Sequence, residues 1–136
     1  MHAAHSLRLG ARWVALCLPL LCGCGTTYHL LQVRPAVGTN HGRPLYLLVR
    51  AMERKAYVSE SYQDVTSKVL NRDKSVLRLE VVHPGHARRF IVGVPRPAGL
   101  GLYFLFTKPS PGWRMYVEPP VPLVVTVELE GNHIKP

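Results

Sequence analysis

The segment Val121-Pro-Leu-Val-Val-Thr-Val-Glu-Leu-Glu130 alternates apolar and polar side chains more regularly than any other part of the sequence. Such alternation is typical of a β-strand with one buried face, because successive side chains of a strand point to opposite sides. The pattern predicts that the polar side chains Thr126, Glu128 and Glu130 face solvent. The side chains predicted to face a core are Val121, Leu123, Val125, Val127 and Leu129.

Six further runs have strand-like patterns, and clusters of Gly and Pro separate most of them. They are residues 28–34, 45–51, 77–81, 90–94, 100–106 and 113–117. The run at 100–106 is apolar enough for a central strand that is buried on both faces. In the run at 77–81 we expect Leu77, Leu79 and Val81 to face inward. Seven short strands at this spacing predict an all-β fold, a β-sandwich of two packed antiparallel sheets.

One segment, residues 58–72, follows a helical pattern instead. Ser61, followed by Asp64 three positions later, resembles a capping box, and Asp64 and Lys68 are spaced for an ion pair. We therefore expect one short helix inserted between strands. Its apolar face, with intervals of three and four residues, would consist of Val58, Tyr62, Val65 and Val69.

The first 24 residues have the features of a bacterial lipoprotein signal. Arg8 and Arg12 precede an apolar run of 10 residues at 13–22, whereas a membrane-spanning helix needs about 20. The tetrapeptide Leu21-Cys-Gly-Cys24 matches the lipoprotein box, in which small residues precede a cysteine whose thiol is alkylated by a lipid. The alternative is an ordinary secretory signal with cysteines in its apolar stretch.

These features predict the domain boundaries. Residues 1–23 form a signal peptide, residues 24–27 form the lipidated N-terminus and a tether, and residues 28–136 form the sandwich domain. Cys24 becomes the first residue of the mature protein and carries the lipid. Three acyl chains on this residue would anchor the protein far more firmly than a single chain.

The composition and the motifs exclude several classes of function. The chain has 17 Lys and Arg against 8 Asp and Glu, a formal net charge of +9, but it lacks the basic and aromatic motifs of a nucleic-acid-binding protein. It contains no phosphate-binding glycine loop, nucleophile elbow or zinc-protease motif. His83 and His86 are spaced as two metal ligands could be, but the Pro-Gly between them predicts a hairpin turn. We expect no catalysis, no metal or other cofactor, no nucleic acid and no small-molecule substrate.

Two features are candidates for binding. The aromatic side chains of Tyr103, Trp113 and Tyr116 could form a platform for a sugar ring, although in a small sandwich such side chains more often belong to the core. The segment from Ala36 to Arg43 joins the first two predicted strands and forms an exposed loop. Loops on a rigid scaffold often recognise a partner, and the alternative is a plain connector.

The order of these features along the chain resembles a known family. A lipoprotein box and a first strand precede Asn40-His-Gly-Arg-Pro-Leu45, and the next strand ends in Val49-Arg50 before the inserted helix. The remaining motifs are, in order, Pro84-Gly85, Leu100-Gly-Leu-Tyr-Phe-Leu-Phe106, Trp113-Arg114 and Leu129-Glu-Gly-Asn-His-Ile134. With this order the chain resembles the outer-membrane lipoproteins of the type VI secretion membrane complex, often called TssJ.

The resemblance implies a transthyretin-like sandwich of two sheets, with a short helical insertion and no catalytic activity. It implies a lipid-anchored adaptor at the periplasmic face of the outer membrane, which binds the periplasmic region of the large inner-membrane secretion subunit (TssM-type). The family's partner-binding loop joins the first two strands, and here it comprises Ala36, Val37, Gly38, Thr39, Asn40, His41, Gly42 and Arg43. The alternative function is a periplasmic lipoprotein that binds peptidoglycan or another envelope glycan through the aromatic platform.

Overall fold

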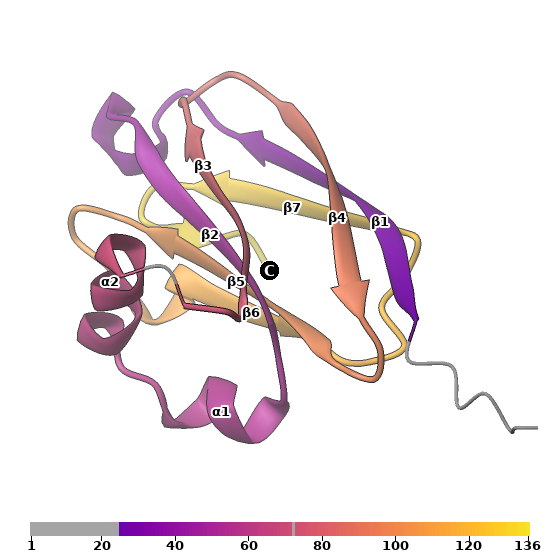
Figure 1. The fold of residues 1–136 in the computed structure, drawn as a ribbon. Helices are drawn as coiled ribbons and strands as arrows, with labels where there is room; N and C mark the ends of the chain where they lie inside the picture. Colours follow the sequence, from indigo (N-terminus) through magenta and orange to yellow (C-terminus); the bar gives the residue numbers. More distant parts are fainter. Residues whose placement is uncertain (1–24, 72) are drawn as a thin grey trace, which may run out of the picture.

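The computed structural model describes residues 25–71 and 73–136, so the predicted signal peptide and Cys24 lie outside the described residues. Within these residues eight strands form two sheets, and the helices α1 (Arg54–Ser59) and α2 (Tyr62–Leu70) follow the second strand (Figure 1). The strands are β1 (Thr26–Pro35), β2 (Leu45–Met52), β3 (Val76–Val82), β4 (Arg88–Pro95), β5 (Gly99–Leu105), β6 (Arg114–Val117), β7 (Val124–Glu130) and β8 (His133–Ile134).

The two sheets enclose one core between them, which confirms the predicted all-β sandwich. The first sheet has the strand order β4-β1-β7-β8, and the second sheet has the order β3-β2-β5-β6. All neighbours in the second sheet are antiparallel. In the first sheet β1 pairs antiparallel with β4 but parallel with β7, so the prediction of purely antiparallel sheets is wrong there. No tight hairpin joins β1 to β7, because the chain builds the second sheet between them, and this long connection permits the parallel pairing.

The alternation predicted for the last long strand is confirmed from Val125 to Glu130, where buried and exposed residues follow each other strictly. Leu123 is different: it is 72% exposed, and β7 begins only at Val124. Pro120 and Pro122 stand before this strand and have no N–H group to donate to a ladder. The strand is therefore shorter than its hydrophobic pattern.

The prediction that the leucines of β3 face inward is wrong. The register with β2 places Glu80 opposite Leu47, a fully buried core residue, so Glu80 and Arg78 lie on the interior side. Arg78 pairs with Glu80, and its guanidinium lies 5.3 Å from the ring centroid of Phe90 in β4. A stacked ion pair thus closes this edge of the sandwich, and Leu79 is left 37% exposed on the outer face.

The helical segment consists of two helices rather than one. Ser61 accepts a hydrogen bond from the backbone N–H of Asp64, and its own N–H donates to the Asp64 carboxylate, so the predicted capping box is confirmed as the start of α2. Because Glu60 and Ser61 are extended, the helix cannot continue back to Val58. Val58 belongs to α1 and is 59% exposed, whereas Val65 of α2 is fully buried.

The two helices cover the outer face of the second sheet, where Glu60 pairs with Arg50 of β2 and Tyr57 packs against Tyr103 of β5. In Figure 1, α2 lies to the left of these strands and α1 lies below them. As predicted, β5 is therefore buried on both faces. Its two glycines make room for this cover: a Cβ at Gly99 would lie 2.2 Å from the Tyr116 hydroxyl, and one at Gly101 would lie 2.6 Å from the sulfur of Met52. Within residues 25–71 and 73–136 no helix covers the outer face of the first sheet, and several of its apolar side chains are exposed.

Candidate functional site

The loop predicted to bind a partner, Ala36 to Arg43, is folded back on the sandwich and only partly exposed. It contains a single short turn, η1 (Thr39–Gly42), in which three consecutive residues have positive φ. The φ angles are 51° at Asn40, 54° at His41 and 74° at Gly42. Positive φ is unusual for side chains other than glycine, although asparagine and histidine adopt it more readily than most.

Asn40 holds this loop in place. Its Nδ2 donates to the carbonyl oxygens of Arg43 at 3.1 Å and Pro44 at 3.2 Å, and its Oδ1 accepts from the backbone N–H of Thr107 at 2.9 Å. Its own N–H donates to the carbonyl of Gly131 at 2.8 Å. One residue, 1% exposed, therefore ties the loop to the segment after β5 and to the turn after β7. Asn40 is a structural residue of the loop and does not offer its side chain to a partner.

Thr39 is the second buried residue of the loop. It is fully buried, and its hydroxyl donates to the carbonyl oxygen of Leu129 at 3.2 Å. The other predicted residues remain accessible, with Val37 at 79% exposure. The accessible part of the predicted site thus consists of Ala36, Val37, Gly38, His41, Gly42 and Arg43.

The turn between β3 and β4 lies beside this loop at the same end of the sandwich (Figure 1). The N–H of Gly85 donates to the carbonyl of Pro35 at 3.1 Å, and a Cβ at Gly85 would lie 3.3 Å from the Val37 side chain. The sequence indicates a turn at this position, but no local signal indicates that it adjoins the loop. Its exposed histidines, His83 and His86, therefore join the accessible surface. Among the described residues, no group of three or more His, Cys, Asp or Glu side chains could hold a metal ion.

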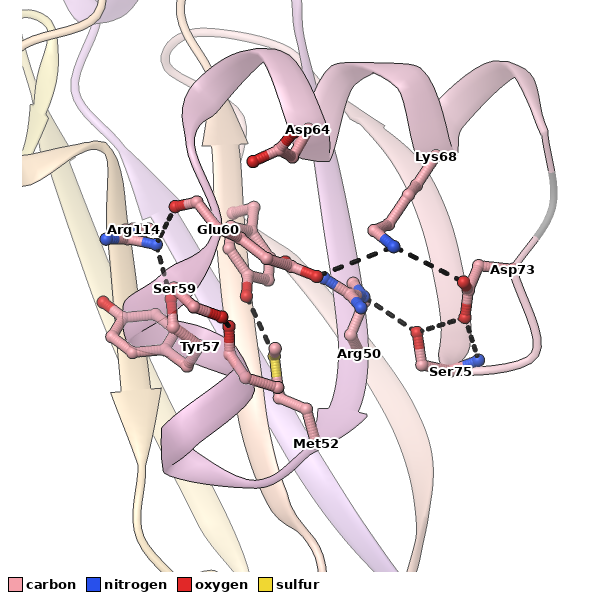
Figure 2. A network of polar contacts seen from close by, with 12 residues as sticks. Arg50, Met52, Tyr57, Ser59, Glu60, Asp64, Lys68, Asp73, Ser75 and Arg114 are labelled. Atoms are coloured by element: carbon pink, nitrogen blue, oxygen red, sulfur yellow. Dashed lines mark hydrogen bonds and ion pairs between the residues drawn. The ribbon is translucent and has the colours of Figure 1, made fainter.

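A second polar cluster fastens the two helices to the second sheet (Figure 2). Arg50 of β2, whose side chain is 5% exposed, pairs with Glu60 and donates from Nε to the Ser75 hydroxyl at 2.9 Å. Lys68 lies 3.6 Å from the Glu60 carboxylate and 3.5 Å from that of Asp73. The ion pair predicted between Asp64 and Lys68 is replaced by these two contacts. Arg50 and Glu60 are largely buried beneath the helices, whereas Lys68 and Asp73 are partly exposed. The bonds of the cluster join the helices to the sheet, which indicates a structural role.

The pKa of Asp73 in this cluster is lowered to about 2, because the backbone N–H and the hydroxyl of Ser75 both donate to its carboxylate. Next to the cluster, Arg114 donates to the carbonyl oxygens of Tyr57 at 2.6 Å and Glu60 at 2.8 Å. These bonds satisfy the carbonyl groups at the end of α1, where the chain leaves the helix. Lys68, Asp73 and Arg114 thus hold the insertion in one position.

The aromatic platform is not available to a sugar. Tyr103 is fully buried and Trp113 is 8% exposed, with their ring centroids 5.6 Å apart. Tyr116 is half-buried, and its hydroxyl donates to the carbonyl of Met52 at 3.1 Å. Burial raises the pKa of Tyr103, as expected for a phenol in the core. The three residues pack the second sheet against α1 and α2.

Gly25, the residue that follows Cys24, is already bonded to the folded domain. Gly25 accepts a hydrogen bond at its carbonyl oxygen from the N–H of Arg96 at 2.9 Å, and β1 starts at Thr26. The strand therefore starts within the residues expected to form a tether, two positions before the expected domain boundary. Cys24 itself lies outside the described residues. Neither helix in the described part of the chain has the length and hydrophobicity needed to span a bilayer.

Comparison with known proteins identifies the family. The family model described as "IglE, N-terminal domain" matches residues 46–129, which is more than half of the chain and runs from β2 to the end of β7. The chain belongs to the IglE N-terminal domain family. This is a family of type VI secretion lipoproteins, and the resemblance found in the sequence is thereby confirmed. No curated protein matches the chain.

Solved structures share the fold of this IglE-family domain. The type VI secretion lipoprotein TssJ1 from Pseudomonas aeruginosa is 16% identical with a TM-score of 0.64, and the match covers 81% of this chain and 94% of that chain. Lip from Serratia marcescens, a membrane-bound component of the type VI secretion system, is 12% identical with a TM-score of 0.63, covering 82% and 96%.

A third match comes from a structure described as the type VI secretion protein TssM C-terminal domain (869–1107) from EAEC. It is 15% identical with a TM-score of 0.65, and it covers 79% of this chain and 95% of that chain. The aligned part of this chain, 79% of 136 residues, spans 95% of the matched chain. The matched chain is therefore shorter than a segment of residues 869–1107 would be. At these identities all three matches establish the fold alone.

Proposed function

We propose that this IglE-family domain is a lipid-anchored, non-catalytic adaptor of the type VI secretion membrane complex at the periplasmic face of the outer membrane. Cys24 carries the lipid, and the accessible part of the loop from Ala36 to Arg43 binds the periplasmic region of a TssM-type inner-membrane subunit. Membership of a family of type VI secretion lipoproteins supports the general role. That Cys24 carries the lipid and that the loop binds the partner are further parts of this proposal.

The observation that carries the partner site is the rigidity of the loop. Buried Thr39 and Asn40 hold its backbone, so that Val37, His41 and Arg43 remain accessible in one fixed arrangement. A surface that is already ordered loses little conformational entropy when it binds. The loop also lies at the far end of β1 from Gly25, a distance of about 30 Å at 3.3 Å per residue. An anchor at Cys24 and a partner at this loop can therefore be engaged together.

The partner site is tested by changing only its accessible side chains. The variant Val37→Ser/His41→Ala/Arg43→Glu keeps Thr39 and Asn40 and should fold normally. We expect its affinity for the periplasmic domain of the TssM-type subunit to fall by on the order of tenfold or more, because a few central residues usually dominate an interface. Titration calorimetry with the two purified domains measures the change.

The matched control is Lys55→Glu, which makes the same charge change at an exposed position of α1, beyond the end of β2 that lies opposite the loop. We expect this variant to bind like the unmodified protein. Equal affinities for the unmodified protein and the triple variant would show that the partner binds elsewhere. Equal losses in both variants would indicate that net charge, and not the loop, governs the interaction.

The anchor is tested separately by Cys24→Ser in the full chain. Without a thiol no diacylglyceride can be attached, so we expect the variant to disappear from the outer-membrane fraction and to be recovered from the periplasm or the inner membrane. Membrane fractionation and the mass of the purified protein give the result. Unchanged outer-membrane fractionation of the variant would rule out Cys24 as the anchor.

A further inference from the structure

The outer face of the first sheet, which no helix of the described residues covers, has an uneven distribution of apolar side chains. The register aligns its residues in rows across β4, β1 and β7. The row nearest the N-terminus contains Thr26 and Pro95, and the next contains Tyr28 and Gly93. The third row contains Ile91, Leu30 and Val124. An exposed sheet face normally carries polar side chains. In these three rows Thr26 is the one polar residue.

The exposure of these residues is large. Tyr28 is 68% exposed and lies over Gly93, where a Cβ would come within 3.0 Å of the tyrosine ring. Ile91 is 58% exposed and Val124 is 51% exposed. Leu123, directly before β7, is 72% exposed, and its carbonyl accepts from the N–H of Leu30 at 2.8 Å. Tyr28, Leu30, Ile91 and Val124 share the outer side of three adjacent strands, and exposed Leu123 lies next to them directly before β7. We call these five residues the apolar face.

The apolar face ends sharply along the strands. The fourth row consists of Arg89, Gln32 and Thr126, and the fifth contains Arg34 and Glu128. All of these side chains are polar or charged. The same sheet face is thus apolar near the start of β1 and polar toward its end. None of the first three rows, all within the described residues, contains an acidic residue.

The apolar face lies at the end where the proposed lipid anchor is attached. Gly25 follows Cys24 directly and is already held by Arg96, whose side chain is exposed beside it. The chain therefore leaves almost no tether between a lipidated Cys24 and the folded sheet. A domain held this closely must touch the bilayer with the surface around Gly25, and the guanidinium of Arg96 suits a phosphate headgroup there.

We propose that the apolar face, defined by Tyr28, Leu30, Ile91, Leu123 and Val124, rests in the headgroup region of the phospholipid bilayer and orients the domain on the membrane. The inference rests on the proposed anchor at Cys24. A tyrosine with an apolar ring and a polar hydroxyl suits such an interface, and aliphatic side chains enter the boundary of the acyl chains. The change to polar residues in the fourth row marks where the sheet leaves the membrane, and the proposed partner loop is held on the periplasmic side.

The contact is tested with the lipidated protein in vesicles of phosphatidylethanolamine and phosphatidylglycerol that contain brominated acyl chains. The mature chain has no cysteine besides Cys24, so a fluorescent probe can be attached at a single new thiol. We expect a probe at Leu123→Cys to be quenched several-fold more strongly than one at Glu130→Cys. Leu123 directly precedes β7 and Glu130 is its last residue, so the two positions are about 23 Å apart by strand geometry. Equal quenching at both positions would overturn the proposal.

A matched pair of tyrosine variants adds a second measurement. In the Leu123→Cys protein, Tyr28→Asp should reduce the quenching several-fold, because a carboxylate is costly to bring to the acyl boundary. Tyr46→Asp, at a 49% exposed tyrosine of the second sheet, should leave the quenching unchanged. A loss of the same size in both variants would contradict the proposed contact. Disulfide-linked dimers of the Leu123→Cys protein in solution would mean that a second copy covers the face instead.

The mass of the purified protein separates this inference from the proposed anchor. Acylated Cys24 with equal quenching at both probe positions would overturn the membrane contact and leave the adaptor proposal standing. If the protein carries no acyl chains, Cys24 is replaced by serine so that the probe again has a single thiol, and the protein is added to the same vesicles from solution. Stronger quenching at Leu123→Cys than at Glu130→Cys would then uphold the apolar face and overturn the anchor.

Discussion

Replacing Glu60 by alanine should lower the free energy of unfolding by about 3 kcal/mol, the size expected when one member of a buried ion pair is removed. The guanidinium of Arg50, with 5% of its side chain exposed, would keep only the Ser75 hydroxyl and the face of Tyr103 as near partners. An uncompensated charge would then remain under α1 and α2. Urea denaturation followed by circular dichroism measures the loss, and an unchanged m-value would show that the folded state remains compact.

The same substitution at an exposed ion pair is the control. Glu118 pairs with Arg54, and both side chains are more than half exposed, at 54% and 59%. Glu118→Ala should therefore cost less than about 1 kcal/mol. The double variant Arg50→Met/Glu60→Leu should recover part of the stability lost in Glu60→Ala, because both charges are then absent. Equal effects of Glu60→Ala and Glu118→Ala would show that burial adds nothing to the Arg50 pair.

Asn40→Ala should cost about 3 kcal/mol and loosen the loop. The change removes two donors from the carbonyls of Arg43 and Pro44, and it leaves the N–H of Thr107 without its acceptor; all three bonds are part-buried. Each buried polar group left unsatisfied costs about 1–3 kcal/mol. The positive φ at position 40 adds to the loss, because alanine tolerates it less well than asparagine. Thermal and urea unfolding measure stability, and amide hydrogen exchange at Arg43 and Thr107 reports on the loop.

His41→Ala separates the loss of side-chain hydrogen bonds from the strain of positive φ. His41 has nearly the same φ, 54°, but its side chain is exposed. Because histidine already bears the strain of positive φ and its side chain makes no buried contact, its replacement should cost less than about 1 kcal/mol. Asn40→Gly removes the side chain but keeps the backbone relaxed, so the stability of this variant should lie between those of the two alanine variants. If Asn40→Ala were as stable as His41→Ala, the side-chain hydrogen bonds would have no measurable role.

The strand pattern of this chain could be predicted because burial leaves a local trace in the sequence. A strand with one face on a core must alternate, and β7 does so from Val125 to Glu130. The start of α2 could also be predicted, because the capping box joins Ser61 to Asp64 through bonds that span only three positions. The β3 prediction failed for the opposite reason. Two of the inner positions of this edge strand hold Arg78 and Glu80, and the Arg78 guanidinium stacks on the ring of Phe90 in another strand.

The sequence located the predicted partner loop but did not show which of its residues are buried. Its composition indicates a surface loop, and six of its residues are indeed accessible. Nothing local distinguishes buried Asn40 from exposed His41, because the partners of Asn40 include the backbone of Thr107 and Gly131, 67 and 91 positions away. The neighbouring turn at Gly85 was missed as part of the surface because its contact with Pro35 also spans half of the domain.

The sequence by itself determined the class of fold, the position of the helical insertion and the family resemblance, since all three follow from residue spacing within short segments. Only the tertiary structure decided which side chains meet. It showed that Tyr103 and Trp113, candidates for a sugar platform, belong to the core. It also placed Arg50 beneath the helices with Glu60. It also aligned Tyr28, Ile91 and Val124 on one face. The reason is physical: pairing of strands across the sheet brings distant residues within contact, and no local pattern records that register.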